Sequence, residues 1–424
     1  MPTIAVIGYS DATRDHLERA AAPSDAIRFA PALRREEAIV RPEGYPFEER
    51  LDLAARRARE VGPEGVLTYW DFPSSLIAPL VARRLGLRYA SLESVMKCEH
   101  KLWFRREQSA VVDAPRFSDF DPFGDDPLSQ IGLDFPFWVK PVVGHSSMLG
   151  FEIGSRAAFD TALEAIRGGV GGLTEPFRYP LSQTRLPEDL ARKGPTLCIA
   201  EELISSGEQY TVEGFASEGE VVIYGVVASV RAPNGHSFAR YQYPAALDGE
   251  TARRMEETAR AIVRRLDYRG CPFNIEFFHE PESGRIHVLE MNSRLSQSHS
   301  DLFHKVDGRP HQAVAVDLAL GRAPRWERGG GRFAVAAKFF LRHYEDGRVA
   351  AVPGEEALAR LLEETPDARV ELNVSEGQRL SDLPQQDAYS FELADIFLGA
   401  RDEAELLRKF ERCRALLRFE ITPD

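Results

Sequence analysis

Glu290, Asn292 and Arg294 alternate along one apolar segment of the sequence. Glu276 lies in the apolar segment before it, and the polar stretch 279–284 between the two segments is typical of a hairpin turn. Alternate residues of a strand share one face, and paired strands lie about 5 Å apart. The sequence therefore predicts that two carboxylates and an amide oxygen converge in an otherwise apolar sheet, with a guanidinium beside them.

Two carboxylates that converge away from water repel each other strongly, so their burial without a cation is costly. A hard divalent cation removes this conflict, because Mg²⁺ prefers oxygen ligands and is often held by one or two carboxylates together with substrate phosphates. Arg294 adds a fixed positive charge that can grip a phosphate or a carboxylate with two hydrogen bonds. The alternative is a surface hairpin whose polar side chains simply face water.

Lys140 ends another apolar strand, and a loop flanked by glycines follows it over 144–150. This loop contains His145, Ser146 and Ser147. The backbone N–H groups of such a loop can close over phosphate oxygens, and a lysine can neutralise the same phosphates. A glycine-flanked loop alone is a weak signal that usually marks a turn, but the strand lysine beside it favours a phosphate-binding site.

A third apolar strand runs into Glu201 and Glu202, which are followed by Leu203 and Ile204, and Glu208 lies just beyond them. Backbone groups of this connection could pair with the edge of an adenine ring, and the last of these acids could accept hydrogen bonds from ribose hydroxyls. The alternative is two strands joined by a turn, with the acids exposed to water.

Composition limits the classes of protein to which the chain can belong. Its 424 residues include 53 Lys and Arg against 66 Asp and Glu, which gives a net charge of −13. Sequence-independent binding to nucleic acid or to an anionic membrane needs a basic surface, so we expect neither partner. No apolar run approaches the ~20 residues of a membrane span, the first residues do not resemble a secretory signal, and the four cysteines form no CxxC pair. We therefore expect a reduced, cytoplasmic protein.

The pattern of apolar residues predicts a mixed α/β and α+β architecture. Strands alternating with helices over 1–95 predict a parallel sheet covered on both faces. Residues 96–330 mix both kinds of element and include an expected helix over 97–109, and 331–424 is expected to form a small α+β lobe. The stretch 167–195 is rich in glycine and proline and is expected to be a loop, either a mobile lid or a plain insertion.

The chain resembles the ATP-grasp superfamily, and within it the carboxylate–amine ligase branch, whose members include biotin carboxylase and the L-amino-acid ligases. The matching motifs are, in chain order, Lys101, Lys140 with the 144–150 loop, Glu201, Glu202, Leu203, Ile204, Glu208, Glu276, and the segment 290–294. No single motif is decisive, but their common order is specific, and the resemblance covers nearly the whole chain.

The resemblance implies an ATP-grasp fold with three parts. These are an N-terminal Rossmann-like preATP-grasp lobe over 1–95, an ATP-grasp domain over 96–330 and a C-terminal α+β lobe over 331–424. Within the ATP-grasp domain it implies a small lid subdomain at about 135–205 and a large catalytic lobe at about 206–330.

The resemblance also implies roles for individual residues. The implied roles are contacts to ATP phosphates by Lys101 and Lys140, backbone contacts to adenine by Glu202 and Ile204, a ribose contact by Glu208, ligation of Mg²⁺ (or Mn²⁺) by Glu276, Glu290 and Asn292, and stabilisation of the transferring phosphoryl group by Arg294.

The chain departs from the family pattern directly after Arg294, where residues 295–300 replace the glycines that relatives often have. We expect side chains of this segment to reach the pocket of the acceptor substrate. The candidate substrate contacts are Arg231, His236, Arg240, Ser296, Ser298 and His299. By position only, His236 and His299 are also candidates for the base that deprotonates an amine.

The activity that the resemblance implies is an ATP-dependent ligase that joins a small-molecule carboxylate to a small-molecule amine through an acyl phosphate, with release of ADP and phosphate. An L-amino-acid ligase is one form of this activity. One alternative is an enzyme similar to biotin carboxylase that acts on bicarbonate, although the chain has no Met-Lys-Met biotinylation motif. The other is an ATP-binding regulatory protein without turnover. A homodimer is expected only by analogy with relatives.

Overall fold

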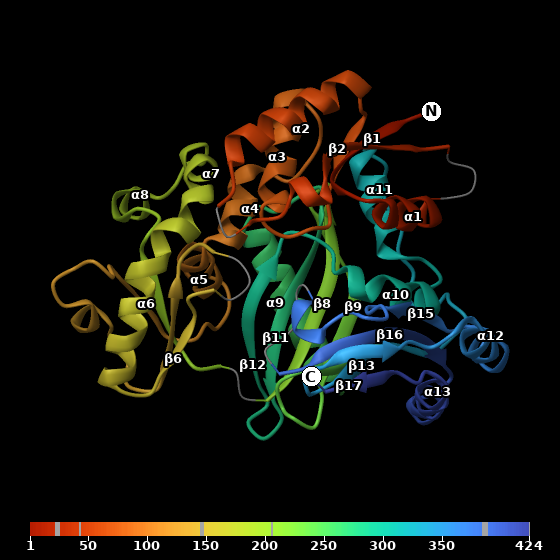
Figure 1. Ribbon diagram of the computed structural model, residues 1–424. Helices are drawn as coiled ribbons and strands as arrows, with labels where there is room; N and C mark the ends of the chain where they lie inside the picture. The colour runs from red at the N-terminus through yellow and green to blue at the C-terminus, as the bar shows by residue number, and fades with distance from the viewer. Residues whose placement is uncertain (22–25, 42–43, 145–147, 205–206, 384–388, 424) are drawn as a thin grey trace.

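The computed structural model describes residues 1–424 except 22–25, 42–43, 145–147, 205–206, 384–388 and 424. It confirms the mixed α/β and α+β architecture, with a three-stranded parallel sheet, two larger antiparallel sheets and a two-stranded antiparallel sheet (Figure 1). None of the helices in these described ranges is long and apolar enough to cross a membrane.

The N-terminal lobe contains a parallel sheet in the order β2-β1-β3. Its strands are β1 (Thr3–Tyr9), β2 (Arg28–Arg34) and β3 (Gly65–Leu67), and a 3₁₀ turn, η1 (Arg35–Glu37), follows β2. Helices α2 (Phe47–Val61) and α3 (Ser74–Leu85) pack on one face, and α1 (Asp11–Ala20) and α11 (His311–Ala319) on the other. Because α11 comes from much later in the chain, the lobe is tied to the rest of the molecule by a shared apolar core (Figure 1).

The second sheet is antiparallel and has the order β4-β7-β5-β6. The strands are β4 (Phe117–Phe120), β5 (Phe137–Pro141), β6 (Phe151–Ile153) and β7 (Cys198–Glu202), and a 3₁₀ turn, η2 (Pro127–Gln130), lies between the first two. Helix α6 (Arg156–Thr174) packs its apolar face on this sheet through Phe159, Ile166 and Val170.

The expectation of a loop over 167–195 is wrong. The segment contains the last turns of α6, then η3 (Glu175–Phe177), α7 (Arg178–Ser182) and α8 (Glu188–Lys193) (Figure 1). Four glycines weaken α6, but burial of Val170 and Leu173 between them offsets that loss. The prolines lie where helices tolerate them, for example Pro187 at the N-cap of α8.

The expected helix over 97–109 is two helices, α4 (Leu92–Glu99) and α5 (Lys101–Ser109). His100 separates them, and its side chain accepts a hydrogen bond from the backbone N–H of Trp103, which caps α5. Lys101 is therefore the first residue of a helix rather than a residue in the middle of one.

The third sheet is the largest and has the order β12-β11-β8-β9-β10-β13-β16-β15, with antiparallel pairing throughout. Its strands are β8 (Glu208–Ser217), β9 (Glu220–Arg231), β10 (Phe238–Tyr243), β11 (Pro272–Glu280), β12 (Arg285–Asn292), β13 (Val335–His343), β15 (Arg369–Leu372) and β16 (Phe391–Ala400). The sheet runs without interruption from β10 into β13, so the C-terminal strands extend the sheet of the preceding domain. The exact lobe boundaries stay predictions.

Helices cover this large sheet on both faces. Helix α9 (Gly249–Arg265) packs on β8 and β9, and α12 (Glu355–Glu364) and α13 (Glu403–Leu416) contribute to the core behind β13 and β16. Helix α10 (Ser300–Asp307), which follows the turn η4 (Gln297–His299), packs on β10, β13 and β16. The remaining elements are β14 (Arg348–Ala351), β17 (Glu420–Thr422) and η5 (Leu380–Asp382).

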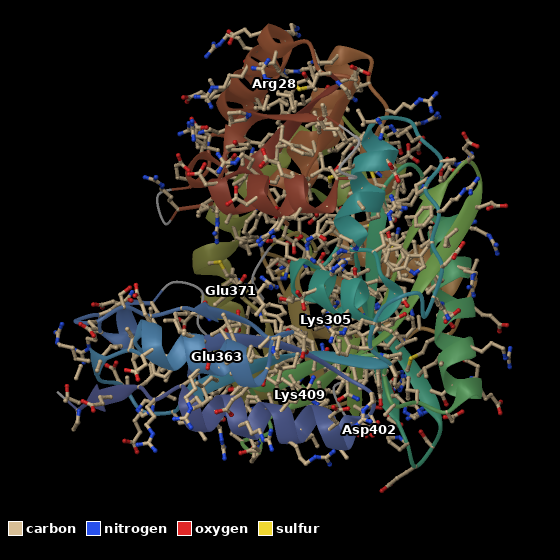
Figure 2. All side chains as sticks on the ribbon, turned by 90° about the vertical axis from the view of Figure 1, so that its right-hand side faces the viewer. Arg28, Lys305, Glu363, Glu371, Asp402 and Lys409 are labelled. Carbon is tan, nitrogen blue, oxygen red and sulfur yellow. The ribbon has the colours of Figure 1, made fainter. Side chains whose placement is uncertain are left out.

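The C-terminal elements and the N-terminal lobe lie at different ends of the molecule. In Figure 2 the labelled residues Glu363, Lys409 and Asp402 lie on the C-terminal part, and Arg28 lies on the N-terminal lobe at the other end. The cavity described below is lined by residues of all three larger sheets.

We predict that Gly171→Ala stabilises the protein by about 0.5–1 kcal/mol, because a glycine inside a helix costs about that much relative to alanine. A Cβ at Gly171 meets no atom within 4 Å, so the new methyl group does not clash. Urea unfolding followed by circular dichroism measures the change. Gly169→Ala is the matched control and should gain less, because its Cβ would lie 3.1 Å from Leu149 Cδ1. A loss of stability in Gly171→Ala would contradict the helical assignment of this segment.

Candidate active site

A cavity of about 970 Å³ lies where the three sheets meet. The N-terminal lobe contributes Trp70 and Asp71, the small sheet contributes Lys140, and the large sheet contributes Glu276 and Glu290. Residues far apart in the sequence thus face one space, which is large enough for a nucleotide and a small substrate.

Glu276 on β11 and Glu290 on β12 are direct cross-strand partners. Burial raises the pKa of Glu276 to about 7, and the neighbouring Glu290 carboxylate raises it further against the opposing effect of Arg294. The two acids therefore lie together as predicted. The ionised form of Glu276 is disfavoured, as expected for buried like charges.

Amide side chains fix the Glu276 carboxylate from both sides. Gln209 Nε2 donates to Glu276 Oε2 at 3.1 Å, and Asn292 Nδ2 donates to Glu276 Oε1 at 3.2 Å. Asn292 Nδ2 also donates to Asn274 Oδ1 at 2.9 Å. In this arrangement the nitrogen of Asn292 faces the carboxylate, so the amide group would have to turn over to present its oxygen to a cation between the acids.

Lys140 and Arg105 share one buried carboxylate. Lys140 Nζ lies 2.6 Å from Glu201 Oε2, and Arg105 donates to Glu201 Oε1. Burial raises the pKa of Glu201, but the two cations outweigh this effect and hold it at about 2. Arg105 also donates to the carbonyls of Val288 at 2.9 Å and Leu289 at 2.8 Å, so it joins the small sheet to strand β12.

Lys101 and Glu99 lie on either side of the α4–α5 break and both line the cavity. Lys101 Nζ donates to the carbonyl of Gly144 at 3.2 Å, and burial together with the nearby Lys140 lowers its pKa. Glu99 accepts a hydrogen bond from Ser75 Oγ at 2.8 Å. Burial raises the pKa of Glu99 to about 7, with further contributions from neighbouring acids.

Arg294 reaches from the end of the large sheet to the N-terminal lobe. Its Nη2 atom lies 2.6 Å from Asp71 Oδ2, and Asp71 lines the cavity. Burial lowers the pKa of Arg294, but Asp71, Glu276 and Glu290 raise it by more. The guanidinium is therefore positioned beside both converging carboxylates.

The donor set fits a divalent cation. Two carboxylates on neighbouring strands, with the pKa of one raised by burial and by the other, provide oxygen ligands of the kind that Mg²⁺ binds, and the adjacent space can admit phosphate oxygens. Lys101 and Lys140, which line the same cavity, can supply positive charge for the same phosphates.

Comparison with known proteins agrees with this geometry. Residues 242–324 match the family described as carbamoyl-phosphate synthase L chain, ATP binding domain. The carbamoyl phosphate synthase large chain of Myxococcus xanthus is 25% identical over 292 residues, which cover 66% of this chain and 24% of that protein. The chain therefore spans about a quarter of the length of this relative.

Solved structures cover the chain more completely. The L-amino acid ligase of Bacillus licheniformis superposes with a TM-score of 0.73 at 16% identity, over 100% of this chain and 99% of that one. The chain has the ATP-grasp fold. The biotin carboxylase of Campylobacter jejuni, solved as an ATP-analogue complex, superposes with a TM-score of 0.66 at 14% identity, over 99% of this chain and 86% of that one.

Most of the residues predicted to bind the nucleotide line the cavity. Glu202, Leu203 and Ile204 form one wall, with Lys101 and Lys140 further in. The N–H of Glu202 donates to the Arg116 carbonyl, so a backbone contact from Glu202 to a base would have to come from its own carbonyl. His145, Ser146 and Ser147 lie outside the described residues.

Glu208 does not line the cavity. It is exposed at the start of β8, and its carboxylate accepts a hydrogen bond from the Tyr210 hydroxyl. Its predicted contact to ribose would require the side chain to turn away from Tyr210, and this contact stays a prediction.

The predicted substrate contacts are spread over two places. Arg231 lines the cavity, whereas His236, Arg240, Ser296, Ser298 and His299 are not among its wall residues. His236 stacks on Tyr389, and Arg240 pairs with Glu403 at 2.6 Å. Their roles as substrate contacts stay predictions.

His299 belongs instead to a buried cluster below the turn that follows Arg294. Glu213, which is fully buried, interacts with Nδ1 of His299 through one oxygen, and its other oxygen lies 3.2 Å from His311 Nε2. The same oxygen accepts from the backbone N–H of Ser296 at 3.3 Å, and His311 Nε2 lies 2.9 Å from the Ser296 carbonyl. The cluster therefore fixes the backbone directly after Arg294.

The sequence analysis missed several residues that the structure places at the site. Arg105 follows Lys101 by four positions on α5, a spacing that puts both cations on one helix face and could have revealed it. Gln209 stands directly beside Glu208 in the sequence and faces Glu276. Glu213 and His311 had no local signal, because their contacts join segments about 100 positions apart.

We predict that Glu201→Gln destabilises the fold by about 3–5 kcal/mol, because it leaves the buried charges of Arg105 and Lys140 without their shared anion. Chemical denaturation monitored by circular dichroism measures the loss. Glu202→Gln is the matched control, since its side chain is exposed, and it should change stability little. Equal stability of both variants would contradict the buried ion-pair assignment.

We also predict that Mg²⁺ binds more tightly at about pH 8 than at about pH 6, and that at about pH 6 its binding displaces a proton. The folded chain holds a proton on Glu276 below a pKa of about 7, whereas a carboxyl in the unfolded chain loses it near 4.5, and the metal needs the ionised form. Calorimetric titration in two buffers with different ionisation enthalpies measures the released proton. Affinity that does not change between these pH values, or binding without proton release, would contradict the assignment.

Proposed function

We propose that the protein is an ATP-dependent, ADP-forming ligase that joins a small carboxylate to a small amine through an acyl phosphate. The observation that carries this proposal is that the paired acids Glu276 and Glu290 line the same cavity as Lys101 and Lys140. Arg294 is not among the lining residues, but both acids raise its pKa. The likeness to L-amino-acid ligase over the whole chain supports it, and an L-amino-acid ligase is the form of the activity that we favour.

The nucleotide would lie across the cavity from one wall to the other. The adenine would rest against the connection Glu202–Leu203–Ile204, and its phosphates would pass Lys101 and Lys140. Lys140 is fixed for this role by Glu201, which Arg105 holds in turn. When bound, Mg²⁺ held by the acidic pair would neutralise phosphate oxygens at the end nearest Arg294.

The reaction follows from the chemistry of a carboxylate. Its own oxygen is a poor leaving group, so the γ-phosphoryl group of ATP is first transferred to the carboxylate, which gives an acyl phosphate and ADP. The amine nitrogen then attacks the acyl carbon, the C–O bond to phosphate breaks, and the amine loses a proton as the amide forms. Arg294 is placed to stabilise negative charge on the phosphoryl group during transfer and on the departing phosphate.

Exclusion of water protects the intermediate, because an acyl phosphate that meets water is hydrolysed. The cavity is walled by three parts of the chain, and the aromatic side chains Trp70 and Phe72 of the N-terminal lobe and Phe104 of α5 contribute to its lining. We further propose a cytoplasmic enzyme that uses Mg²⁺ or Mn²⁺. We propose a homodimer only by analogy with relatives.

The test is turnover with ATP, Mg²⁺ and pools of acids and amines, followed through ADP and phosphate. We expect release that requires both an acid and an amine, because the acyl phosphate is consumed only when an amine attacks it. Dependence on bicarbonate alone would support an activity like that of biotin carboxylase, and ATP binding without turnover in any pool would support a regulatory protein. AMP and pyrophosphate as products would contradict the acyl-phosphate mechanism.

We predict that Glu290→Ala and Arg294→Ala each lower turnover by about 10²–10³ or more, because each removes charge stabilisation that the reaction needs. Arg285→Ala and Glu282→Ala are matched controls, since both residues are exposed on the same hairpin and outside the cavity. Circular dichroism verifies that all four variants are folded. Retained activity in both active-site variants would remove the site assignment.

A further inference from the structure

Arg35 lines the cavity with its guanidinium stacked on an aromatic ring. It is the first residue of η1, after strand β2, and its guanidinium lies over the Trp70 ring at 4.3 Å from the ring centre. The indole is fixed in turn, because Trp70 Nε1 donates to the carbonyl of Gly8 at 2.9 Å. Gly8 is required there, since a Cβ at this position would lie 2.3 Å from the Trp70 ring. Gly8 and Trp70 therefore position the Arg35 guanidinium in the cavity wall.

Arg35 differs from the other cations of the cavity. Lys140 and Arg105 are paired with Glu201, Lys101 donates to the Gly144 carbonyl, and Arg231 donates to the His236 carbonyl and Gln209. Within the described ranges, Arg35 has neither an ion pair nor a hydrogen bond from its guanidinium. A cation stacked on an aromatic ring keeps its N–H edge free for a planar anion such as a carboxylate.

The charges of the cavity change sign between Arg35 and the metal-binding acids. Trp70, beneath Arg35, is followed in the chain by Asp71, and Asp71 and Glu99 both line the cavity and influence each other electrostatically. Glu290 also lines the cavity and also raises the pKa of Glu99, so these acids form one negatively charged part of the wall. A ligand with a carboxylate at one end and a protonated amine beside it would match this order of a positive and then a negative wall.

The remaining wall near Arg35 is apolar. Ile39, Val40 and Phe72 also line the cavity, and the first two follow Arg35 closely in the chain. The nucleotide would lie against Glu202, Leu203 and Ile204, so its phosphates would be bound by Lys101 and Lys140. The carboxylate that is activated would react beside Arg294, which leaves Arg35 for an anion that does not react.

We propose that Arg35 binds the carboxylate of the amine substrate, and that this substrate is therefore an amino acid with an apolar side chain. This inference rests on the proposed ligase function, because that function supplies the need for an amine. Arg35 is here a specificity-determining residue, and Trp70 and Gly8 are the residues that position it.

Binding measurements test the assignment without turnover. L-Leucine and L-phenylalanine, and the same two compounds as carboxamides, are titrated calorimetrically into the protein saturated with a nonhydrolysable ATP analogue and Mg²⁺. We expect the amides to bind at least about tenfold more weakly than the acids to the unaltered protein, because they lack the charged group that Arg35 contacts. Arg35→Gln should weaken binding of the acids to the level of the amides and leave nucleotide binding unchanged.

Arg28→Gln is the matched control, because Arg28 is exposed on β2 at the far end of the lobe and outside the cavity (Figure 2). It should keep the full preference for the acids. Equal binding of acids and amides by the unaltered protein, a preference that survives in Arg35→Gln, or no binding of any probe would each overturn the assignment. A preference that depends on Arg35 in a protein that forms no amide bond would instead show that the subsite is correct and the ligase function is wrong.

Discussion

The proposed site depends on one constraint: two carboxylates that repel each other are held on adjacent strands. Glu276 and Glu290 are cross-strand partners in a sheet whose other face is packed with apolar side chains, so neither can turn far toward bulk water. Without a cation, burial and then repulsion by Glu290 favour a proton on Glu276, which is why its pKa lies near 7. The arrangement costs stability in the absence of ligand, and such a cost is typical of a binding site rather than of a structural core.

The surrounding contacts serve to keep this site rigid while three sheets meet around it. Arg105 joins the small sheet to β12 through Glu201 and two backbone carbonyls, and Arg294 joins the large sheet to the N-terminal lobe through Asp71. Helix α11 joins the same lobe to the rest of the chain through apolar packing. Ion pairs and hydrogen bonds therefore hold the cavity walls together. Apolar packing holds the N-terminal lobe to the rest of the chain.

Much of the fold and the centre of the site could be predicted from local pattern. The alternation of Glu290, Asn292 and Arg294 identified the strand, its face and its pairing with the strand of Glu276, because strand periodicity acts over a few residues. The helix at 167–174 was missed because its glycines suggest a loop, and burial against the small sheet outweighs that preference. The cluster around Glu213 was missed because its histidines come from distant segments, and no short-range pattern indicates such a contact.

The most direct test of the central claim is a crystal structure with a nonhydrolysable ATP analogue and Mn²⁺, whose anomalous signal locates the metal. The account predicts a metal peak between the carboxylates of Glu276 and Glu290, at roughly 2.0–2.3 Å from their oxygens, with the phosphates between it and Lys140. A metal and nucleotide bound elsewhere, or a nucleotide in the cavity with both carboxylates turned away from it, would contradict the account.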